Sequence, residues 1–387
     1  MYKIVNKKKL YATIAADAVG ALVYAPARLL KRREEVRPAE VRELLVIRTA
    51  YIGDVVMTLP LLKPLRQRFP QARISFLTGT RAAAVLENNP YLDAVIGYDP
   101  FWFYPSGVAG YRSFISELRR TRFDLVIEAR ADIRELLFLV RPLKARHKVS
   151  YDIGGGGYLL TDVVPYGGLK HKVEYHLDIA RHLGCPEGPV DWGVYLREEE
   201  EREVGEILRR AGIEGPFIAI HPGSRLPLKL WSPERYAALC DALGACQGLP
   251  VVLLGSPDER PLAARIADIA SRKTVNLAGG LPLRELAGVL SRATILVCND
   301  SSPMHIAAAM KTPTVAVFGP SKSVETGPYA VPSRVVEKHY PCRLDCDEST
   351  CRNPAKPHGC MRDIAVEDVL CAAEDLLAQV GGDHVPV

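Results

Sequence analysis

The chain has 387 residues, of which 48% are hydrophobic and 25% are charged, and this composition is that of an ordinary globular protein. The length exceeds what one hydrophobic core usually supports, so we expect two domains. Residues 1–42 contain ten Lys or Arg and only four Asp or Glu, while the net charge of the whole chain is only +5. A nucleic-acid-binding protein would carry basic residues over its folded surface, so this distribution argues against nucleic acid as a partner.

The N-terminal arm, residues 1–42, has a basic start, an apolar middle and a basic end. Its apolar stretch from Leu10 to Ala25 is too short to span a bilayer comfortably, and Asp17 interrupts it. Three interpretations fit the pattern: a helix that lies on anionic lipid, a cleaved signal peptide, and a helix that packs on the protein's own body. We expect the first, which predicts a cytoplasmic protein held peripherally on the inner face of the cytoplasmic membrane.

From Glu43 onwards, short apolar runs alternate with stretches of helical spacing. We expect strands at residues 43–48, 72–79, 92–98 and 123–130, and helices at 59–69, 81–89 and 135–143. This alternation is typical of a parallel, doubly wound α/β sheet.

The pattern restarts after the charged stretch 197–212, which we expect to be a surface helix. Further strands are expected at residues 216–224, 249–256, 293–300 and 312–319, and helices at 232–243, 260–270, 282–293, 301–310 and 366–380. Ser232 is the predicted N-cap of the helix that follows it, with Pro233 at the first helical position. No GxGxxG motif follows a strand, which argues against a dinucleotide-dependent dehydrogenase.

Two consecutive series of this kind predict two Rossmann-like domains that face each other across a cleft. The predicted domain limits are 1–42 for the arm, 43–196 for the first Rossmann-like domain, 197–340 for the second, 341–362 for a Cys-rich insert, and 363–387 for a C-terminal helix and tail.

Gly53 and Asp54 follow the first predicted strand, at the end where ligands gather in open α/β sheets. Gly53 permits a tight turn, and Asp54 stands where a helix is expected to begin. Asp54 is then either a helix cap or a carboxylate that removes a proton from an acceptor hydroxyl. The residues alone favour neither interpretation.

Two loops of the second half carry groups suited to an anion. Ser224 ends a strand, and Lys229 lies in the basic loop after it, which suits a diphosphate; the alternative is a solvated lysine. Asp300, Ser301 and Ser302 end another strand. The free amides of that turn and the following helix dipole make an anion site, although a plain capped helix would have the same sequence.

Together and in this order, the motifs are specific. The chain closely resembles the heptosyltransferases of glycosyltransferase family nine in the segments VIRTAYIGDVVMTLPLLKPLRQRFPQARISFLT, IAIHPGSRLPLKLWSPERY, VVLLGSPDER, NLAGGLPLRELAGVLSRATILVCNDSSPMHIAAAM and TPTVAVFGP. The resemblance runs from Glu43 to Tyr329. It implies a GT-B fold and an inverting transfer of a heptose from ADP-heptose to a lipopolysaccharide core acceptor, with no cofactor required for the chemistry.

The resemblance also implies roles for single residues. Asp54 matches the general base of the family's GD motif, and Lys229 matches its phosphate-binding lysine. Ser224 lies at the donor-diphosphate loop. Glu259 is placed like the acid that holds the nucleotide ribose, a role that Asp258 could also take.

Asp300, Ser301, Ser302 and Met304 match the family's loop for the donor sugar and phosphate. This loop reads Asp-Ser-Ser-Pro-Met-His, whereas the family more commonly has Asp-Thr/Ser-Gly-x-x-His. The missing glycine changes the backbone freedom near the phosphate, and it leaves the identity of the donor open.

Four of the nine cysteines lie close together, at Cys342, Cys346, Cys351 and Cys360. Their spacing contains no CxxC pair, so it is not a standard zinc signature. Three states are compatible with it: a structural zinc or iron ion, disulfides, and unligated thiols.

Two other functions remain open. One is another GT-B enzyme that uses a UDP-sugar, since the fold alone does not select the substrate. The other is an inactive, membrane-attached scaffold that only binds glycan or lipid. The joint presence of Asp54, Lys229 and Asp300 argues against the scaffold, because a decayed site would have lost at least one of them.

Overall fold

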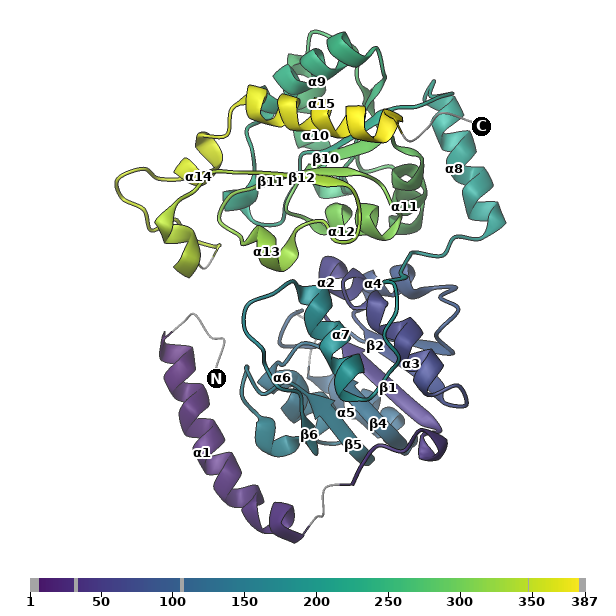
Figure 1. The fold of residues 1–387 in the computed structure, drawn as a ribbon, viewed down its shortest axis with the longest axis vertical. Helices are drawn as coiled ribbons and strands as arrows, with labels where there is room; N and C mark the ends of the chain where they lie inside the picture. The colour runs from purple at the N-terminus through teal and green to yellow at the C-terminus, as the bar shows by residue number, and fades with distance from the viewer. Residues whose placement is uncertain (1–6, 31–33, 105–107, 347, 383–387) are drawn as a thin grey trace. The chain divides into compact units, whose positions relative to one another are not determined.

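The computed structural model describes residues 7–30, 34–104, 108–346 and 348–382. The chain forms two compact units, Met1–Trp192 and Gly193–Val387, which Figure 1 draws with their helices and strands. The boundary thus falls between Trp192 and Gly193, slightly before the predicted limit at 196. Each unit is a parallel sheet covered by helices, as the sequence predicts.

The first unit is built on a six-stranded sheet in the order β3-β2-β1-β4-β5-β6. Its strands are β1 (Glu43–Arg48), β2 (Arg73–Thr78), β3 (Ala94–Gly97), β4 (Phe123–Glu128), β5 (Ala145–Ser150) and β6 (Asp162–Val163). In the central strand, Val46 pairs with Phe76 on one side and Ile127 on the other. The three side chains are fully buried, which explains the continuous apolar runs of these strands.

Helices of the first unit are mostly short. They are α1 (Lys7–Leu30), α2 (Ile52–Val56), α3 (Leu62–Arg68), α4 (Thr80–Ala83), α5 (Ala109–Leu118), α6 (Ile133–Glu135) and α7 (Lys172–His182), with single turns η1 (Pro38–Glu40), η2 (Leu59–Leu61), η3 (Ala84–Leu86), η4 (Leu136–Val140) and η5 (Gly157–Leu159). The helices predicted at 59–69, 81–89 and 135–143 are therefore each divided between an α-helix and a different kind of turn.

The N-terminal helix α1 packs on the body of its own unit. It contacts η5, on the side where β6 ends the sheet (Figure 1). The Asp17 carboxylate accepts a hydrogen bond from the Gly156 amide at 2.8 Å. Among the described residues, no helix is long and apolar enough to cross a membrane.

The second unit repeats the plan, with a six-stranded sheet in the order β12-β11-β10-β7-β8-β9. Its strands are β7 (Ile218–His221), β8 (Val251–Leu253), β9 (Val275–Asn276), β10 (Ile295–Asn299), β11 (Thr314–Phe318) and β12 (Ser333–Glu337). Its helices are α8 (Glu198–Arg210), α9 (Pro233–Gln247), α10 (Arg260–Ile269), α11 (Leu283–Arg292), α12 (Ser302–Ala309), α13 (Ser323–Thr326), α14 (Gly359–Arg362) and α15 (Val366–Gly382), with turns η6 (Pro227–Lys229), η7 (Pro257–Glu259) and η8 (Pro341–Asp345).

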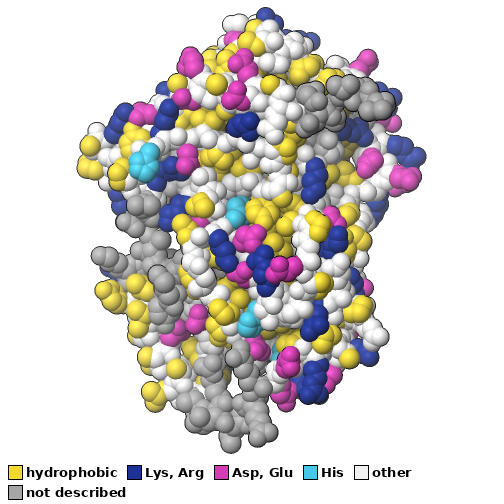
Figure 2. All heavy atoms as spheres, viewed as in Figure 1, with side chains coloured by type: hydrophobic (Ala, Val, Ile, Leu, Met, Phe, Trp, Pro, Cys, Tyr) yellow, Lys and Arg dark blue, Asp and Glu magenta, His cyan; other side chains and the backbone are white. Residues whose placement is uncertain are grey.

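Local sequence signals explain the helix starts in this unit. The Ser232 hydroxyl accepts from the Arg235 amide at the start of α9, and Pro233 takes the first helical position, as predicted. The C-terminal helix is tied to the same region, because the buried Trp231 indole donates to the Ile364 carbonyl at 3.0 Å. Figure 2 shows acidic and basic side chains interspersed over the visible surface.

Candidate active site

Asp54 is the third residue of α2, directly beyond the carboxyl end of β1. Its side chain caps the helix, since one oxygen accepts from the Tyr51 amide at 3.4 Å. The other oxygen lies 2.9 Å from the Arg48 guanidinium and 3.0 Å from the Lys172 ammonium. The side chain is 15% exposed. Asp54 is therefore a helix cap and also a partly accessible carboxylate held between two cations.

These charges decide the protonation state of Asp54. Burial alone would raise its pKa, but Lys172, Arg48 and Arg130 together hold the pKa well below its ordinary value. The carboxylate is therefore ionised at any physiological pH. Such a group accepts a proton only as the donor hydroxyl becomes acidic, which happens when that oxygen forms its new bond.

Sequence reasoning missed the residues that surround Asp54. Arg48 ends the apolar strand β1 and is buried, and Lys172 is the first residue of α7, a helix that we did not predict. The buried His176, one turn later, lies 2.8 Å from the Met57 carbonyl and 3.0 Å from the Ala129 carbonyl. The one sequence signal that could have pointed to these residues is Arg48, a charged residue at the end of an apolar strand.

A buried acid pair lies at the carboxyl end of β4. The Glu128 carboxylate accepts from the Ser150 hydroxyl at 2.6 Å, and Glu135 accepts from the Thr49 hydroxyl at 2.5 Å. Burial, and then the charge of Glu135, raise the pKa of Glu128 to about 8. Glu135 thus holds the side chain of Thr49, the residue that follows Arg48 in the sequence.

In the second unit, β7 and β10 are neighbours in the sheet, and their carboxyl-end loops meet. Ser224 donates to the Asp300 carbonyl at 3.4 Å. The buried His221 joins two further groups, since its ring nitrogens lie 3.3 Å from the Glu259 carboxylate and 3.2 Å from the Ser301 hydroxyl. The structure thus gathers the predicted donor residues of this unit at one sheet edge.

Lys229 ends the turn η6 and is only 13% exposed. Its ammonium group lies 2.7 Å from the Asp300 carboxylate and 2.7 Å from Glu348. Burial would lower the pKa of Lys229, but the two carboxylates raise it, so the group is a fixed positive charge. Glu348 belongs to the Cys-rich insert, and nothing in its sequence context pointed to the site.

Glu259, rather than Asp258, is the acid that reaches this loop. The Glu259 carboxylate accepts from the Ser256 amide at 2.8 Å, whereas Asp258 is exposed. A Cβ atom at Gly223 would lie 1.9 Å from the Glu259 carboxylate, so only glycine permits this approach. Burial would raise the pKa of Glu259, but His221 and Ser256 lower it to about 2.

The loop after β10 has two kinds of residue. Ser301 precedes α12, and Ser302 is its first residue, so both lie where the helix has free amides. Met304 is fully buried, so its side chain packs in the core beneath the loop. A contact of Met304 with the donor stays a prediction.

One prediction for the Cys-rich insert is a structural zinc or iron ion. In the described part of the chain, no group of three or more His, Cys, Asp or Glu residues is arranged to hold a metal ion. None of the four cysteines forms a disulfide, and their environments differ: Cys342 is exposed, while Cys360 is buried. Without such a group in the described part of the chain, the zinc or iron prediction is not supported.

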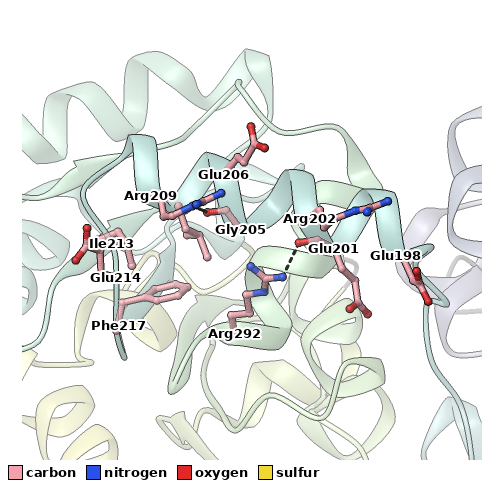
Figure 3. A pocket seen from close by; sticks show the side chains of 12 residues that line it. Glu198, Glu201, Arg202, Gly205, Glu206, Arg209, Ile213, Glu214, Phe217 and Arg292 are labelled. Atoms are coloured by element: carbon pink, nitrogen blue, oxygen red, sulfur yellow. Dashed lines mark hydrogen bonds between the residues drawn. The ribbon is translucent and has the colours of Figure 1, made fainter.

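A large surface groove of about 940 Å³ lies elsewhere in the second unit, between α8 and the end of α11 (Figure 3). Arginines and glutamates line it, and the Arg292 guanidinium donates to the Glu201 carbonyl at 2.5 Å. None of the predicted site residues lies in its wall. Its size alone therefore does not connect it with the chemistry.

Two parallel α/β units with these loops at their carboxyl edges define a GT-B glycosyltransferase. Solved structures agree on the fold. *Escherichia coli* ADP-heptose LPS heptosyltransferase II matches with a TM-score of 0.70 and 25% identity, covering 88% of this chain and 99% of that one. A family 9 glycosyl transferase from *Veillonella parvula* matches with a TM-score of 0.75 and 24% identity, covering 87% and 97%.

The sequence then specifies the family. Residues 111–356 match the family model of glycosyltransferase family 9 (heptosyltransferase), and the chain belongs to this family. Lipopolysaccharide heptosyltransferase 3 of *Escherichia coli* K12 is 28% identical over 345 residues, which is 85% of this chain and 96% of that protein. The protein is thus a glycosyltransferase of the lipopolysaccharide heptosyltransferase type.

Proposed function

We propose that this enzyme transfers a heptose from ADP-heptose to the core of a lipopolysaccharide acceptor, with inversion at the anomeric carbon. The observation that carries the proposal is the convergence of Ser224, Lys229, Glu259 and Asp300 at the carboxyl ends of β7 and β10. This edge is where nucleotides bind in parallel sheets. An *Escherichia coli* heptosyltransferase of the same fold was solved with ADP-2-deoxy-2-fluoro heptose, which supports the choice of donor.

In this proposal the second unit binds the donor. Lys229 and the free amides at Ser301 and Ser302 hold the diphosphate, and they stabilise the charge that builds on it as the sugar leaves. Glu259 accepts hydrogen bonds from the ribose hydroxyls, because its low pKa keeps it ionised. No step requires a metal ion.

The first unit supplies the base. The acceptor hydroxyl binds beside Asp54, attacks the anomeric carbon from the face opposite the diphosphate, and passes its proton to the Asp54 carboxylate. The Asp54 oxygen nearest the Tyr51 amide accepts a hydrogen bond of 3.4 Å, longer than the contacts of the other oxygen, so we assign the proton to it. Arg48 and Lys172 orient the carboxylate through its other oxygen.

A thermal-shift panel of ADP-, UDP- and GDP-sugars tests the donor. Ligand at 100 times its dissociation constant stabilises the folded state by about 2.7 kcal/mol, which is readily measured as a rise in Tm. We expect ADP-heptose and ADP to raise Tm, and Lys229→Ala to abolish the rise. A response to UDP-sugars alone would contradict the proposal. It would favour the second candidate, a UDP-sugar enzyme, for which Ser302 in place of the family's glycine is the specific reason.

A further inference from the structure

Helix α1 turns its more polar face to the protein and leaves its apolar face exposed. Its half-buried residues follow a spacing of three and four, which is one face of a helix. They are Leu10, Thr13, Asp17, Gly20 and Tyr24. This face, the inner seam, is the one that meets the protein, and it is the more polar side of the helix.

Specific contacts hold the inner seam in place. Asp17 accepts from the Gly156 amide, and the Tyr24 hydroxyl accepts from the Arg141 guanidinium at 2.8 Å. Two glycines allow a close approach: a Cβ at Gly20 would lie 2.3 Å from the Tyr158 ring, and one at Gly155 would lie 2.4 Å from Thr13. Gly155 also has a φ of +88°, a left-handed backbone conformation that favours glycine.

The opposite face of α1 is apolar and exposed. Between Leu10 and Tyr24, every exposed side chain belongs to Ala, Val, Ile, Leu or Tyr. Leu22 is 80% exposed, Val23 69% and Val19 65%. The one acid of the helix is Asp17, and the inner seam takes it out of this outer face.

A surface helix normally turns its apolar stripe to the core and its polar residues to water. α1 does the opposite, so its outer face is suited to an apolar surrounding. The helix is not apolar enough to span a bilayer. A helix that lies in the boundary between lipid headgroups and acyl chains fits both observations. Its apolar face then leaves water, and the helix does not have to cross the bilayer.

The charges around α1 select the kind of surface. The sequence has Lys7, Lys8 and Lys9 before the apolar stretch and a basic run, Lys31 to Arg33, after it. Anionic headgroups attract such clusters, whereas two copies of this basic arm would repel each other. The charges therefore favour a lipid surface over a second copy of the chain.

A groove of about 510 Å³ lies along one flank of α1, between the helix and the body of its unit. Val19, Val23, Leu137 and Tyr158 are in its wall, and Arg141 lies beside them. An apolar wall with a cation at its side matches an anionic phospholipid, which has an acyl chain next to a phosphate.

We propose that the outer face of α1 is a docking surface for anionic phospholipid bilayers, and that the inner seam fixes the first unit to the membrane in one orientation. The proposal rests on the packing of α1, on the groove beside it and on the charges that flank it, and it is independent of the donor and the acceptor.

The test is co-sedimentation of the full-length enzyme with vesicles of phosphatidylcholine, with and without phosphatidylglycerol. We expect binding only to the anionic vesicles. The double variant Val19→Glu/Leu22→Glu should bind at least about tenfold more weakly, because charge is placed in the apolar phase. Both sites are exposed, so the circular dichroism spectrum and Tm should not change.

The matched control is Ile269→Glu, which puts the same charge on an exposed apolar residue at the end of α10. It should bind vesicles like the unaltered enzyme. Equal vesicle binding by the double variant would overturn the proposal. So would self-association of the unaltered enzyme in sedimentation velocity that the double variant loses while it still binds vesicles, since the outer face would then bind a second copy.

Discussion

At the scale of single residues, the chemistry of Asp54 depends on its cationic neighbours. Arg48 and Lys172 contact the carboxylate directly, and their charges outweigh the effect of its burial on the pKa. An ionised, oriented carboxylate is ready to accept a proton without first losing one. The sequence motif points to Asp54, but one of the two cations that contact it, Lys172, comes from a distant part of the chain.

Replacing Asp54 with Asn should lower kcat by at least about 100-fold, because the proton acceptor is lost. The affinity for ADP should not change, since the residues proposed to bind the donor belong to the other unit. The two measurements are kcat from a steady-state activity assay and the ADP dissociation constant from titration calorimetry. The control is Asp132→Asn, which removes another mostly buried carboxylate of the first unit, one that pairs with Arg130 and Arg134. This variant should keep most of the activity. Near-normal turnover of Asp54→Asn would remove the assignment.

If Lys229 binds the diphosphate as proposed, Glu348 competes with that ligand for the Lys229 ammonium group. Its carboxylate lies 2.7 Å from the Lys229 ammonium and is about one third exposed. Exposed ion pairs contribute about 0.2–1 kcal/mol, so Glu348→Gln should tighten ADP binding by up to about fivefold. Titration calorimetry measures this change.

A suitable control for this change is Glu234→Gln, which breaks an exposed pair with Arg265 in the same unit and should leave ADP affinity unaltered. Weaker ADP binding by Glu348→Gln would show that Glu348 itself contacts the ligand, contrary to our expectation.

At the scale of elements, the sequence predicts most of the strands that form the two sheet centres. The strands that were missed lie towards the sheet edges: β5 and β6 in one unit, β9 and β12 in the other. β5 carries charged residues and β6 and β9 have two residues each, so none presents a continuous apolar run. Helix α7 was missed as well, although it brings Lys172 and His176 to the site.

Within α7, His176 links two other elements through the carbonyls of Met57 and Ala129. Burial, and then the charge of Arg48, lower its pKa from 6.5 to about 4. Between these values the unfolded chain binds a proton that the folded chain does not. The free energy of unfolding should therefore fall as the pH drops from about 6.5 to 4, by up to about 1.4 kcal/mol per pH unit.

Urea unfolding at several pH values measures this dependence. His176→Gln does not titrate and should lose that part of the slope, whereas substituting the exposed His339 in the same way should keep it. Identical slopes for His176→Gln and the unaltered enzyme would rule out His176 as the group responsible.

At the scale of the whole molecule, the two units divide the proposed reaction. The proposed base belongs to the first unit, and every residue proposed to bind the donor belongs to the second. We expect ADP to slow hydrogen exchange in the loops at Ser224–Lys229 and Asp300–Ser302, and to leave α2 and α7 unchanged. Hydrogen exchange followed by mass spectrometry reads each loop separately. If ADP slowed exchange in α2 and not in the two loops of the second unit, the proposed nucleotide site would be wrong.

The sequence by itself determined the two α/β series, the order of the motifs and the family, because alternating apolar runs and loops at strand ends are local patterns. Only the tertiary structure decided what surrounds Asp54 and which way α1 faces. Lys172 is 118 residues from Asp54 along the chain, and Gly156 is 139 from Asp17. Contacts of this length depend on how the strands are ordered in the sheet, and no local pattern contains that order.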